Sequence, residues 1–155
     1  RRQRQMCIRD SYKTQGKTLW DAMIEMYEQF GYYKDDIKAV TMKGIEGLQK
    51  IQDIMNSLRQ NPPAEFAGHK VVAVRDYKAD TIKNLETGEV TPTGLPNSNV
   101  LYYELTNDAW VCVRPSGTEP KVKFYYGVKG TSLADADEKS AVMGKAVLDM
   151  VDSMM

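Results

Sequence analysis

The sequence predicts an α+β fold in which an antiparallel β-sheet is flanked by two α-helices. Apolar residues recur at helical spacing in two separate segments, residues 45–58 and 132–154. Between these segments lie several short runs rich in β-branched and aromatic residues, and turn-forming residues separate the runs. The resulting order is strand, helix, several strands, helix, which places the helices on one face of the sheet.

The expected helices have recognisable ends. An additional helix is expected after Thr18, because Thr18 and Asp21 have the spacing of a capping box and Gly31 is typical of a helix end. The middle helix must stop at Pro62, and the last helix begins with a second capping-box pattern at Ser132. The apolar face expected for the middle helix consists of Ile45, Leu48, Ile51, Met55 and Leu58.

Several short strands are expected between and before the two helices. The pair Asn107-Asp108 is typical of a tight hairpin turn between two of them. Residues 80–99 are rich in Gly, Pro, Asn and Thr, so a loop is expected there. The expected strands are Ile37–Met42, Lys70–Val74, Val100–Leu105, Trp110–Arg114 and Lys121–Val128.

Composition argues against several classes of protein. Lys plus Arg and Asp plus Glu both number 21, so no overall basic field that would attract nucleic acid is expected. No apolar run is long enough to span a membrane, and a single histidine leaves little for a zinc cluster or a histidine-based triad. Two cysteines and the absence of a signal-peptide pattern indicate a reducing, cytoplasmic location.

The first eleven residues differ from the rest of the chain. They contain four Arg and one Asp, and their apolar residues follow neither a helical nor a strand period. We therefore expect residues 1–11 to be a non-native or disordered segment outside the fold, with a genuine basic arm as the alternative.

The run from Arg114 to Lys121 has the composition of an anion-binding loop. The guanidinium of Arg114 can hold a phosphate through two parallel hydrogen bonds. Ser116 and Thr118 provide hydroxyl groups, and Gly117 is expected to allow backbone dihedrals that present consecutive N–H groups to an oxyanion. The same composition is also typical of a plain hairpin turn. The candidate phosphate ligands are Arg114, Ser116, Gly117, Thr118, Lys121 and Lys123.

Other candidate sites are weaker. His69 has no cysteine or histidine partner, so an ordinary loop or surface position is expected. The segment 44–47 could bind an anion at a helix start, but a strand-to-helix turn is the simpler interpretation. Tyrosines on paired strands could stack nucleic-acid bases, although core packing fits the neutral net charge better. These tyrosines are Tyr102, Tyr103, Tyr125 and Tyr126.

The loop and its surroundings resemble a known family. The run RPSGTEPK, followed by Val-Lys-Phe-Tyr-Tyr, is similar to the signature loop in the last domain of the α-D-phosphohexomutases, the family of phosphoglucomutase, phosphomannomutase and phosphoglucosamine mutase. The strand at Trp110, the segment 37–58, the helix from Ser132 and the stretch KTLWDAMIEMYEQFGYY are similar as well. The resemblance covers residues 12–155.

The resemblance implies a domain organisation and a role for the loop. Residues 35–155 would form the last, TATA-box-binding-protein-like domain, and residues 12–34 the helix and linker that leave the preceding domain. The loop residues Arg114, Ser116, Gly117 and Thr118 would hold the substrate phosphate that is not being transferred. The enzyme would move a phosphoryl group between C1 and C6 of a hexose phosphate, as phosphoglucomutase does.

The sequence lacks the other motifs of that family, namely the phosphorylatable serine, the Asp-rich magnesium loop and the sugar-binding Gly-Glu loop. We therefore expect Mg²⁺ and all catalytic residues to lie outside this stretch, and the chain to be inactive alone. Its expected partners are a phosphosugar and the upstream domains of the same enzyme, with neither nucleic acid nor a membrane. The alternative is a non-catalytic module of the same fold that binds a phosphorylated ligand or nucleic acid.

Overall fold

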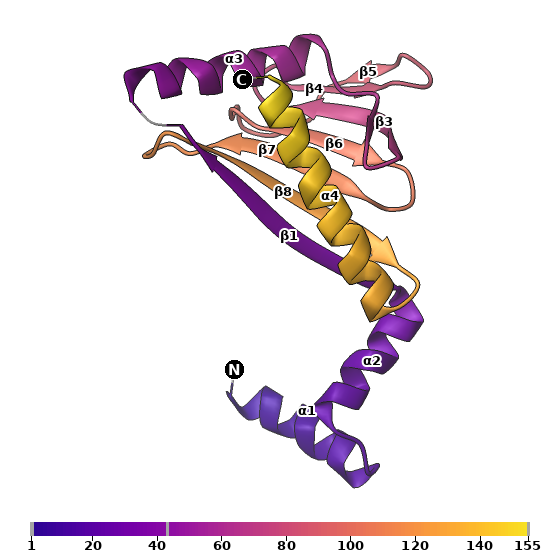
Figure 1. The fold of residues 1–155 in the computed structure, drawn as a ribbon. Helices are drawn as coiled ribbons and strands as arrows, with labels where there is room; N and C mark the ends of the chain where they lie inside the picture. Colours follow the sequence, from indigo (N-terminus) through magenta and orange to yellow (C-terminus); the bar gives the residue numbers. More distant parts are fainter. Residues whose placement is uncertain (1, 43, 155) are drawn as a thin grey trace.

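The computed structural model describes residues 2–42 and 44–154, which form a sheet with helices packed on it and two further helices at the N-terminal end (Figure 1). In chain order the elements are α1 (Arg2–Thr14), α2 (Leu19–Phe30), β1 (Tyr32–Thr41), α3 (Ile45–Gln60), β2 (Glu65–Phe66), β3 (His69–Asp76), β4 (Thr81–Asn84), β5 (Val90–Thr91), β6 (Leu101–Leu105), β7 (Trp110–Pro115), β8 (Lys121–Gly130) and α4 (Leu133–Ser153).

The sheet is antiparallel throughout. Its strands run in the order β1-β8-β7-β6-β3-β4-β5, and β2 pairs with β3 off this path. The longest pairing joins β1 to β8, from Tyr32 opposite Gly130 to Thr41 opposite Lys121. Strand β1 therefore forms one edge of the sheet and lies beside β8, the strand that leads into α4.

One face of the sheet is covered and the other is open. Along β6, β7 and β8 alternate side chains are fully buried and their neighbours are partly exposed, as the two-residue period of a strand requires. The buried face packs against α3 and α4, so the expected α+β fold with an antiparallel sheet flanked by two helices is confirmed. The shared core includes Leu101, Tyr103, Val111, Val113, Val122, Phe124, Tyr126, Ile54, Met55, Leu58, Met143, Val147 and Val151.

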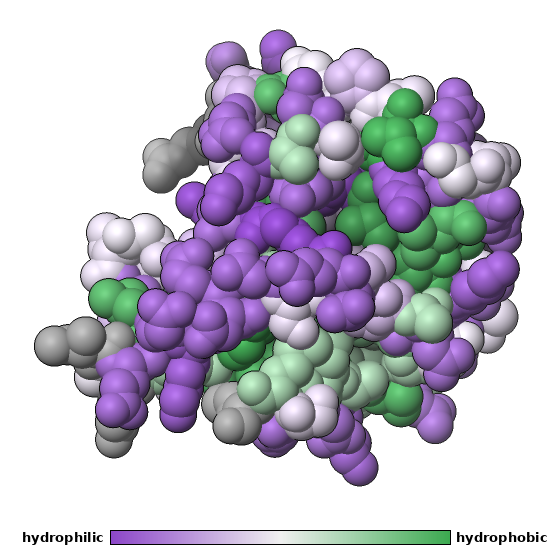
Figure 2. Space-filling view, turned by 90° about the horizontal axis from the view of Figure 1, so that it is seen from above, coloured by the Kyte–Doolittle hydropathy of each residue, from purple (hydrophilic) through white to green (hydrophobic). Residues whose placement is uncertain are grey.

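Helix α3 is amphipathic and lies at one end of the sheet (Figure 1). Viewed from that end, the surface is mostly hydrophilic (Figure 2). The predicted apolar face is correct for Ile51, Met55 and Leu58, which are buried, but wrong for Leu48, which is 56% exposed. The first turn of α3 extends beyond the covered sheet face, and this leaves Leu48 without a core to enter. The side chain of Ile45, also placed on that face, lies outside the described residues.

Helix α4 approaches the sheet closely because glycine and a buried serine line part of its inner side. A Cβ atom on Gly144 would overlap the hydroxyl of the buried Tyr126 and lie 2.7 Å from Cε of Lys38, so a larger residue there would force these side chains or α4 to shift. The helix begins as predicted, since the Asp135 N–H donates to Oγ of the N-cap residue Ser132 at 3.1 Å. The Asp135 carboxylate reaches one residue further back and accepts from the Thr131 N–H at 2.7 Å.

Three local expectations need correction. Residues 1–11 were expected to lack regular structure, but α1 spans Arg2–Thr14; its charged residues leave it outside the core, next to α2 (Figure 1). The strand expected at residue 37 begins at Tyr32, because the long ladder with β8 outweighs the low strand propensity of Lys34, Asp35 and Asp36. The loop expected at 80–99 contains the short strands β4 and β5.

Two other local predictions are confirmed. Helix α2 has the complete capping box, in which Thr18 accepts from the Asp21 N–H and the Asp21 carboxylate accepts from the Thr18 N–H. The hairpin between β6 and β7 turns through Asn107 and Asp108, whose φ angles are 61° and 56°. Positive φ at both positions is what a tight hairpin turn requires, and Asn and Asp tolerate it better than most residues.

Helix α2 exposes apolar side chains. None of its residues is buried. Phe30 is 64% exposed and Trp20 is 58% exposed. Among the described helices, none combines the length and apolar character needed to cross a membrane.

Candidate functional site

The loop between β7 and β8 forms one wall of a surface hollow. Residues 116–120 line it from one side, and Gly44 and Leu48 at the start of α3 line it from the other. The hollow measures about 490 Å³, enough to admit a phosphate group and part of a sugar. Of the predicted ligands, Ser116, Gly117 and Thr118 are in its lining. Arg114, Lys121 and Lys123 are not.

The backbone of the loop is held at both ends and left free in the middle. The Ser116 N–H donates to the carbonyl of Lys121 at 2.8 Å, and the Met42 N–H donates to the carbonyl of Pro120 at 2.8 Å. Within the described residues, the N–H groups of Gly117, Thr118 and Glu119 have no backbone or side-chain acceptor. Three consecutive amides are therefore available to an anion in the hollow.

Gly117 contributes differently from what its sequence position suggested. It was expected to provide dihedrals that other residues resist, but it is not among the glycines with positive φ. A Cβ atom added to Gly117 would have no heavy atom within 4 Å. Neither a positive φ nor a close neighbour therefore requires glycine at this position.

Arg114 and Lys123 lie directly opposite each other on β7 and β8. Their neighbours Val113 and Phe124 are buried on the covered face, so both cations project from the open face next to the loop. Arg114 is exposed, and neither cation has an ion pair or a side-chain hydrogen bond within the part of the chain that the structure describes. Like charges directly opposite on a sheet are destabilising, and a bound anion would relieve this repulsion.

The charge of Arg114 also reaches the adjacent thiol. Cys112 is two residues before Arg114 on the same face of β7, opposite Tyr125 of β8. Burial raises the pKa of the Cys112 thiol, and the positive charge of Arg114 acts in the opposite direction. Cys112 is a free thiol, which is unsuited to nucleophilic chemistry when its pKa is raised.

Lys121 differs from the other two cations because it already has a partner. Its Nζ lies 3.1 Å from a carboxylate oxygen of Glu119. Glu119 in turn lines the hollow with Ser116, Gly117 and Thr118. The structure thus divides the six predicted ligands into a loop that surrounds the hollow, an unpartnered pair of cations on the open face, and a lysine in an ion pair.

The start of α3 was considered from the sequence as an anion site or, more simply, a strand-to-helix turn, and in the structure Gly44 and Leu48 line the hollow. Its N-cap residue Gly44 has a φ of 79° and no side chain to cap the first turn. The N-terminal end of a helix carries free N–H groups and a partial positive charge. No local sequence signal could have shown this, because residues 44–48 and 116–120 meet only through the sheet.

The other sites considered from the sequence do not compete with the loop. The Nδ1–H of His69 donates to the Thr106 carbonyl, 3.1 Å away, which is an ordinary structural contact. Tyr103 and Tyr126 are buried and unavailable for stacking bases, and Tyr102 stacks on Trp110 at 5.6 Å. Within residues 2–42 and 44–154 there is no group of three His, Cys, Asp or Glu side chains placed to hold a metal ion.

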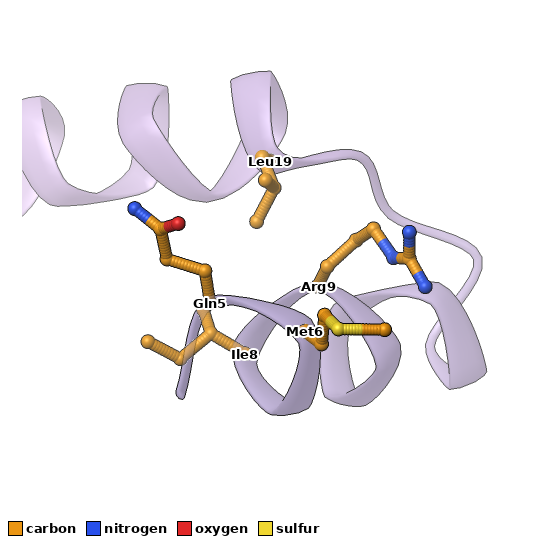
Figure 3. A pocket seen from close by; sticks show the side chains of 5 residues that line it. All are labelled: Gln5, Met6, Ile8, Arg9 and Leu19. Carbon is orange, nitrogen blue, oxygen red and sulfur yellow. The ribbon is translucent and has the colours of Figure 1, made fainter. Parts of the chain in front are cut away.

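Another hollow, of about 620 Å³, lies between α1 and α2, far from the loop in sequence (Figure 3). Its lining includes the apolar side chains of Met6, Ile8 and Leu19. Among the described residues of this lining, Arg9 is the charged one, and its guanidinium is paired with Asp10 at 2.8 Å. This chemistry does not suit an anionic ligand.

The comparisons with known proteins identify the family of the chain. The family model of the phosphoglucomutase/phosphomannomutase C-terminal domain matches residues 54–143, which include the whole loop and both flanking strands. The chain therefore belongs to the phosphoglucomutase/phosphomannomutase family, in which it corresponds to the C-terminal domain.

Its relatives are longer proteins. A phosphoglucomutase of Staphylococcus aureus strain bovine RF122 / ET3-1 is 37% identical over 131 residues, which are 84% of this chain and 24% of that protein. The phosphoglucomutase of strain N315 is 36% identical over the same lengths. A solved structure of the Paramecium phosphoprotein pp63/parafusin, in its open form, has a TM-score of 0.47 and 12% identity, covering 88% of this chain and 22% of that one. The chain thus spans about a quarter of the curated relatives it matches.

Proposed function

We propose that this chain is the substrate-phosphate-binding part of a phosphohexomutase that acts in a phosphoglucomutase-like manner. The principal support is the unpartnered pair Arg114 and Lys123, which lies beside a loop with three free amides. In the proposal the guanidinium of Arg114 and the hydroxyls of Ser116 and Thr118 hold the phosphate that is not transferred. The amides of the loop receive its remaining oxygens.

The contribution of such a site is to position the substrate. A phosphate held at one end of a hexose fixes the distance and direction of the other end, where a phosphoryl group is exchanged between C1 and C6. The binding free energy of the remote phosphate can in this way lower the barrier at the reacting end. Because the candidate ligands contact a phosphate and no particular sugar hydroxyl, the loop can accept either phosphate of a substrate that reverses its orientation.

The chemistry itself is assigned to other parts of a longer enzyme. The described residues do not fit a magnesium site, since no cluster of three suitable ligands is present among them. We propose that Mg²⁺ and the phosphorylated serine are held by upstream domains. These domains are the expected partners of α2 and of the hollow beside the loop. A cytoplasmic setting and a hexose phosphate as substrate belong to the same proposal.

Titration of the chain with inorganic phosphate and with glucose 1-phosphate tests the binding role. Arg114→Ala should weaken phosphate binding about tenfold to a hundredfold, since a charged hydrogen-bonding group is removed. In the full-length enzyme the same substitution should cost about 2 to 4 kcal/mol of transition-state stabilisation, measured as kcat/KM. Normal kcat/KM in the variant would contradict the assignment, and phosphate binding without any effect on turnover would favour a non-catalytic module.

A further inference from the structure

Among the described residues that line the hollow, Glu119 carries a negative charge, which is unfavourable for a phosphate. Its side chain lines the hollow together with Ser116, Gly117 and Thr118. A carboxylate close to a bound phosphate repels it, and the repulsion is substantial at a partly screened surface. A loop that only had to bind phosphate would gain affinity from a neutral residue at this position.

The Glu119 carboxylate is held in place by Lys121. The ion pair measures 3.1 Å between Nζ of Lys121 and one carboxylate oxygen, and a hydrogen bond of 3.2 Å joins Nζ to the other oxygen. The backbone between them is tight, since the Lys121 N–H donates to the carbonyl of Glu119 at 2.7 Å. The Glu119 side chain is 52% exposed and lines the hollow, and the Lys121 side chain is 32% exposed beside it, so solvent and small ions can reach the pair.

The three cations near the loop are therefore not equivalent. In the part of the chain that the structure describes, Arg114 and Lys123 are without an ion pair, whereas the charge of Lys121 is matched by Glu119. A phosphate that binds beside the loop can therefore interact directly with Arg114 and Lys123. To interact with Lys121, it must first displace the Glu119 carboxylate.

We propose that Glu119 is a built-in competitor of the phosphate, which occupies Lys121 in the empty site and limits how tightly the loop holds its ligand. This inference rests on the proposed function, because it concerns regulation of the same site. A bound phosphate takes the place of the Glu119 carboxylate at Lys121, and the carboxylate returns when the phosphate leaves. The return of the carboxylate favours release, which a site needs if its ligand must leave and bind again in the opposite orientation.

The central test is the affinity of the chain for inorganic phosphate, measured by calorimetric titration. Glu119→Gln should bind phosphate about three to ten times more tightly than the wild type, because the repulsion is removed and Lys121 is released. The gain should shrink as salt is added, since exposed charges are screened. Unchanged or weaker binding by Glu119→Gln would overturn the proposal.

The matched control is Glu86→Gln. Glu86 also forms an exposed ion pair with a lysine, Lys70, at 3.4 Å, but this pair is remote from the hollow. The control removes the same charge and should leave phosphate affinity unchanged. Circular dichroism and thermal unfolding confirm that both variants are folded, and an exposed pair contributes too little stability for its loss to unfold the chain.

A second variant separates competition from simple repulsion. In a Lys121→Gln background, Glu119→Gln should improve phosphate binding by a smaller factor, because the cation for which the two anions compete is gone. An equal gain in both backgrounds would overturn the role as competitor. Failure of the wild-type chain to bind phosphate at all would instead refute the proposed function and this inference with it, so the two failures are distinguishable.

Discussion

Gly47 lies against the backbone of Met42 so closely that a Cβ atom at position 47 would be 2.7 Å from the Met42 carbonyl carbon. The N–H of the same Met42 donates to the carbonyl of Pro120 in the loop, at 2.8 Å. The first turn of α3 and the loop after β7 are therefore both positioned against one residue at the end of β1. The two walls of the hollow are fixed relative to each other by this arrangement.

Gly47→Ala should accordingly destabilise the chain and enlarge or distort the hollow. Replacing Gly by Ala within a helix normally gains about 1 kcal/mol, but the contact with Met42 should cost about 1 to 3 kcal/mol or more. Urea denaturation should show a net loss of stability, and phosphate binding should weaken as α3 shifts. The control is Gly117→Ala, which meets no atom within 4 Å and should unfold like the wild type. A Gly47→Ala variant as stable as its parent would show that the contact can relax freely.

Neutralising either member of the pair Arg114 and Lys123 should have opposite effects on stability and on binding. In phosphate-free buffer, Lys123→Gln should raise the free energy of unfolding by about 0.2 to 1 kcal/mol, because two like charges no longer face each other. The same variant should bind phosphate more weakly. Urea unfolding with and without phosphate measures both effects. Lys83→Gln, a remote charge on β4, should change neither, and a loss of stability in Lys123→Gln would argue against the repulsion.

Stability should fall in acid through Asp135. Hydrogen bonds from Lys139 and from the Thr131 backbone lower the pKa of Asp135 to about 2. Because this pKa lies below that of the unfolded chain, the contribution is complete above about pH 4 and is lost as the pH falls towards 2. Asp135→Asn should remove this part of the pH dependence in urea titrations at pH 2 to 7. Asp149→Asn, an exposed carboxylate on the same helix, should retain it, and a variant of Asp135 with the parental acid profile would contradict the assignment.

The two free thiols should react at different rates. Burial raises the pKa of Cys112, whereas Cys7 is exposed on α1, so a thiol reagent at pH 8 should modify Cys7 first. Because the charge of Arg114 opposes the rise, Arg114→Gln should move the pH profile of Cys112 modification to still higher pH. The profile of Cys7 serves as an internal reference. Equal profiles for Cys112 in the two proteins would show that the guanidinium does not act on the thiol.

The fold could be predicted from the sequence where local patterns and long-range packing agree. The alternation predicted for Lys121–Val128 and the helical spacing of Met143 and Val147 both follow from which face is buried, so the inner faces of β8 and α4 were correct at these positions. Prediction failed where packing overrides local preference. Lys34, Asp35 and Asp36 are poor strand formers, yet they pair with β8 because the ladder continues through them.

The site could be predicted only in part. The sequence identified the loop and its cations, because Arg114, Ser116 and Thr118 are close along the chain. It could not show that Gly44 and Leu48 lie across from them or that Arg114 faces Lys123, since these depend on the path of a distant helix and on strand register. It also misjudged Gly117, because the dihedral angles of a glycine are not encoded in its identity.

In β7 and β8 the candidate binding residues alternate with core residues, so the two-residue period of a strand sets the direction of both. Val113 and Phe124 point inward for the same reason that Arg114 and Lys123 point outward. Deleting a single residue at the start of β8 would turn the strand over, carrying a lysine into the interior and an aromatic ring into water. The number of residues in the β7–β8 hairpin is thus as constrained as their identity. Related sequences should therefore differ here by substitutions and not by insertions or deletions.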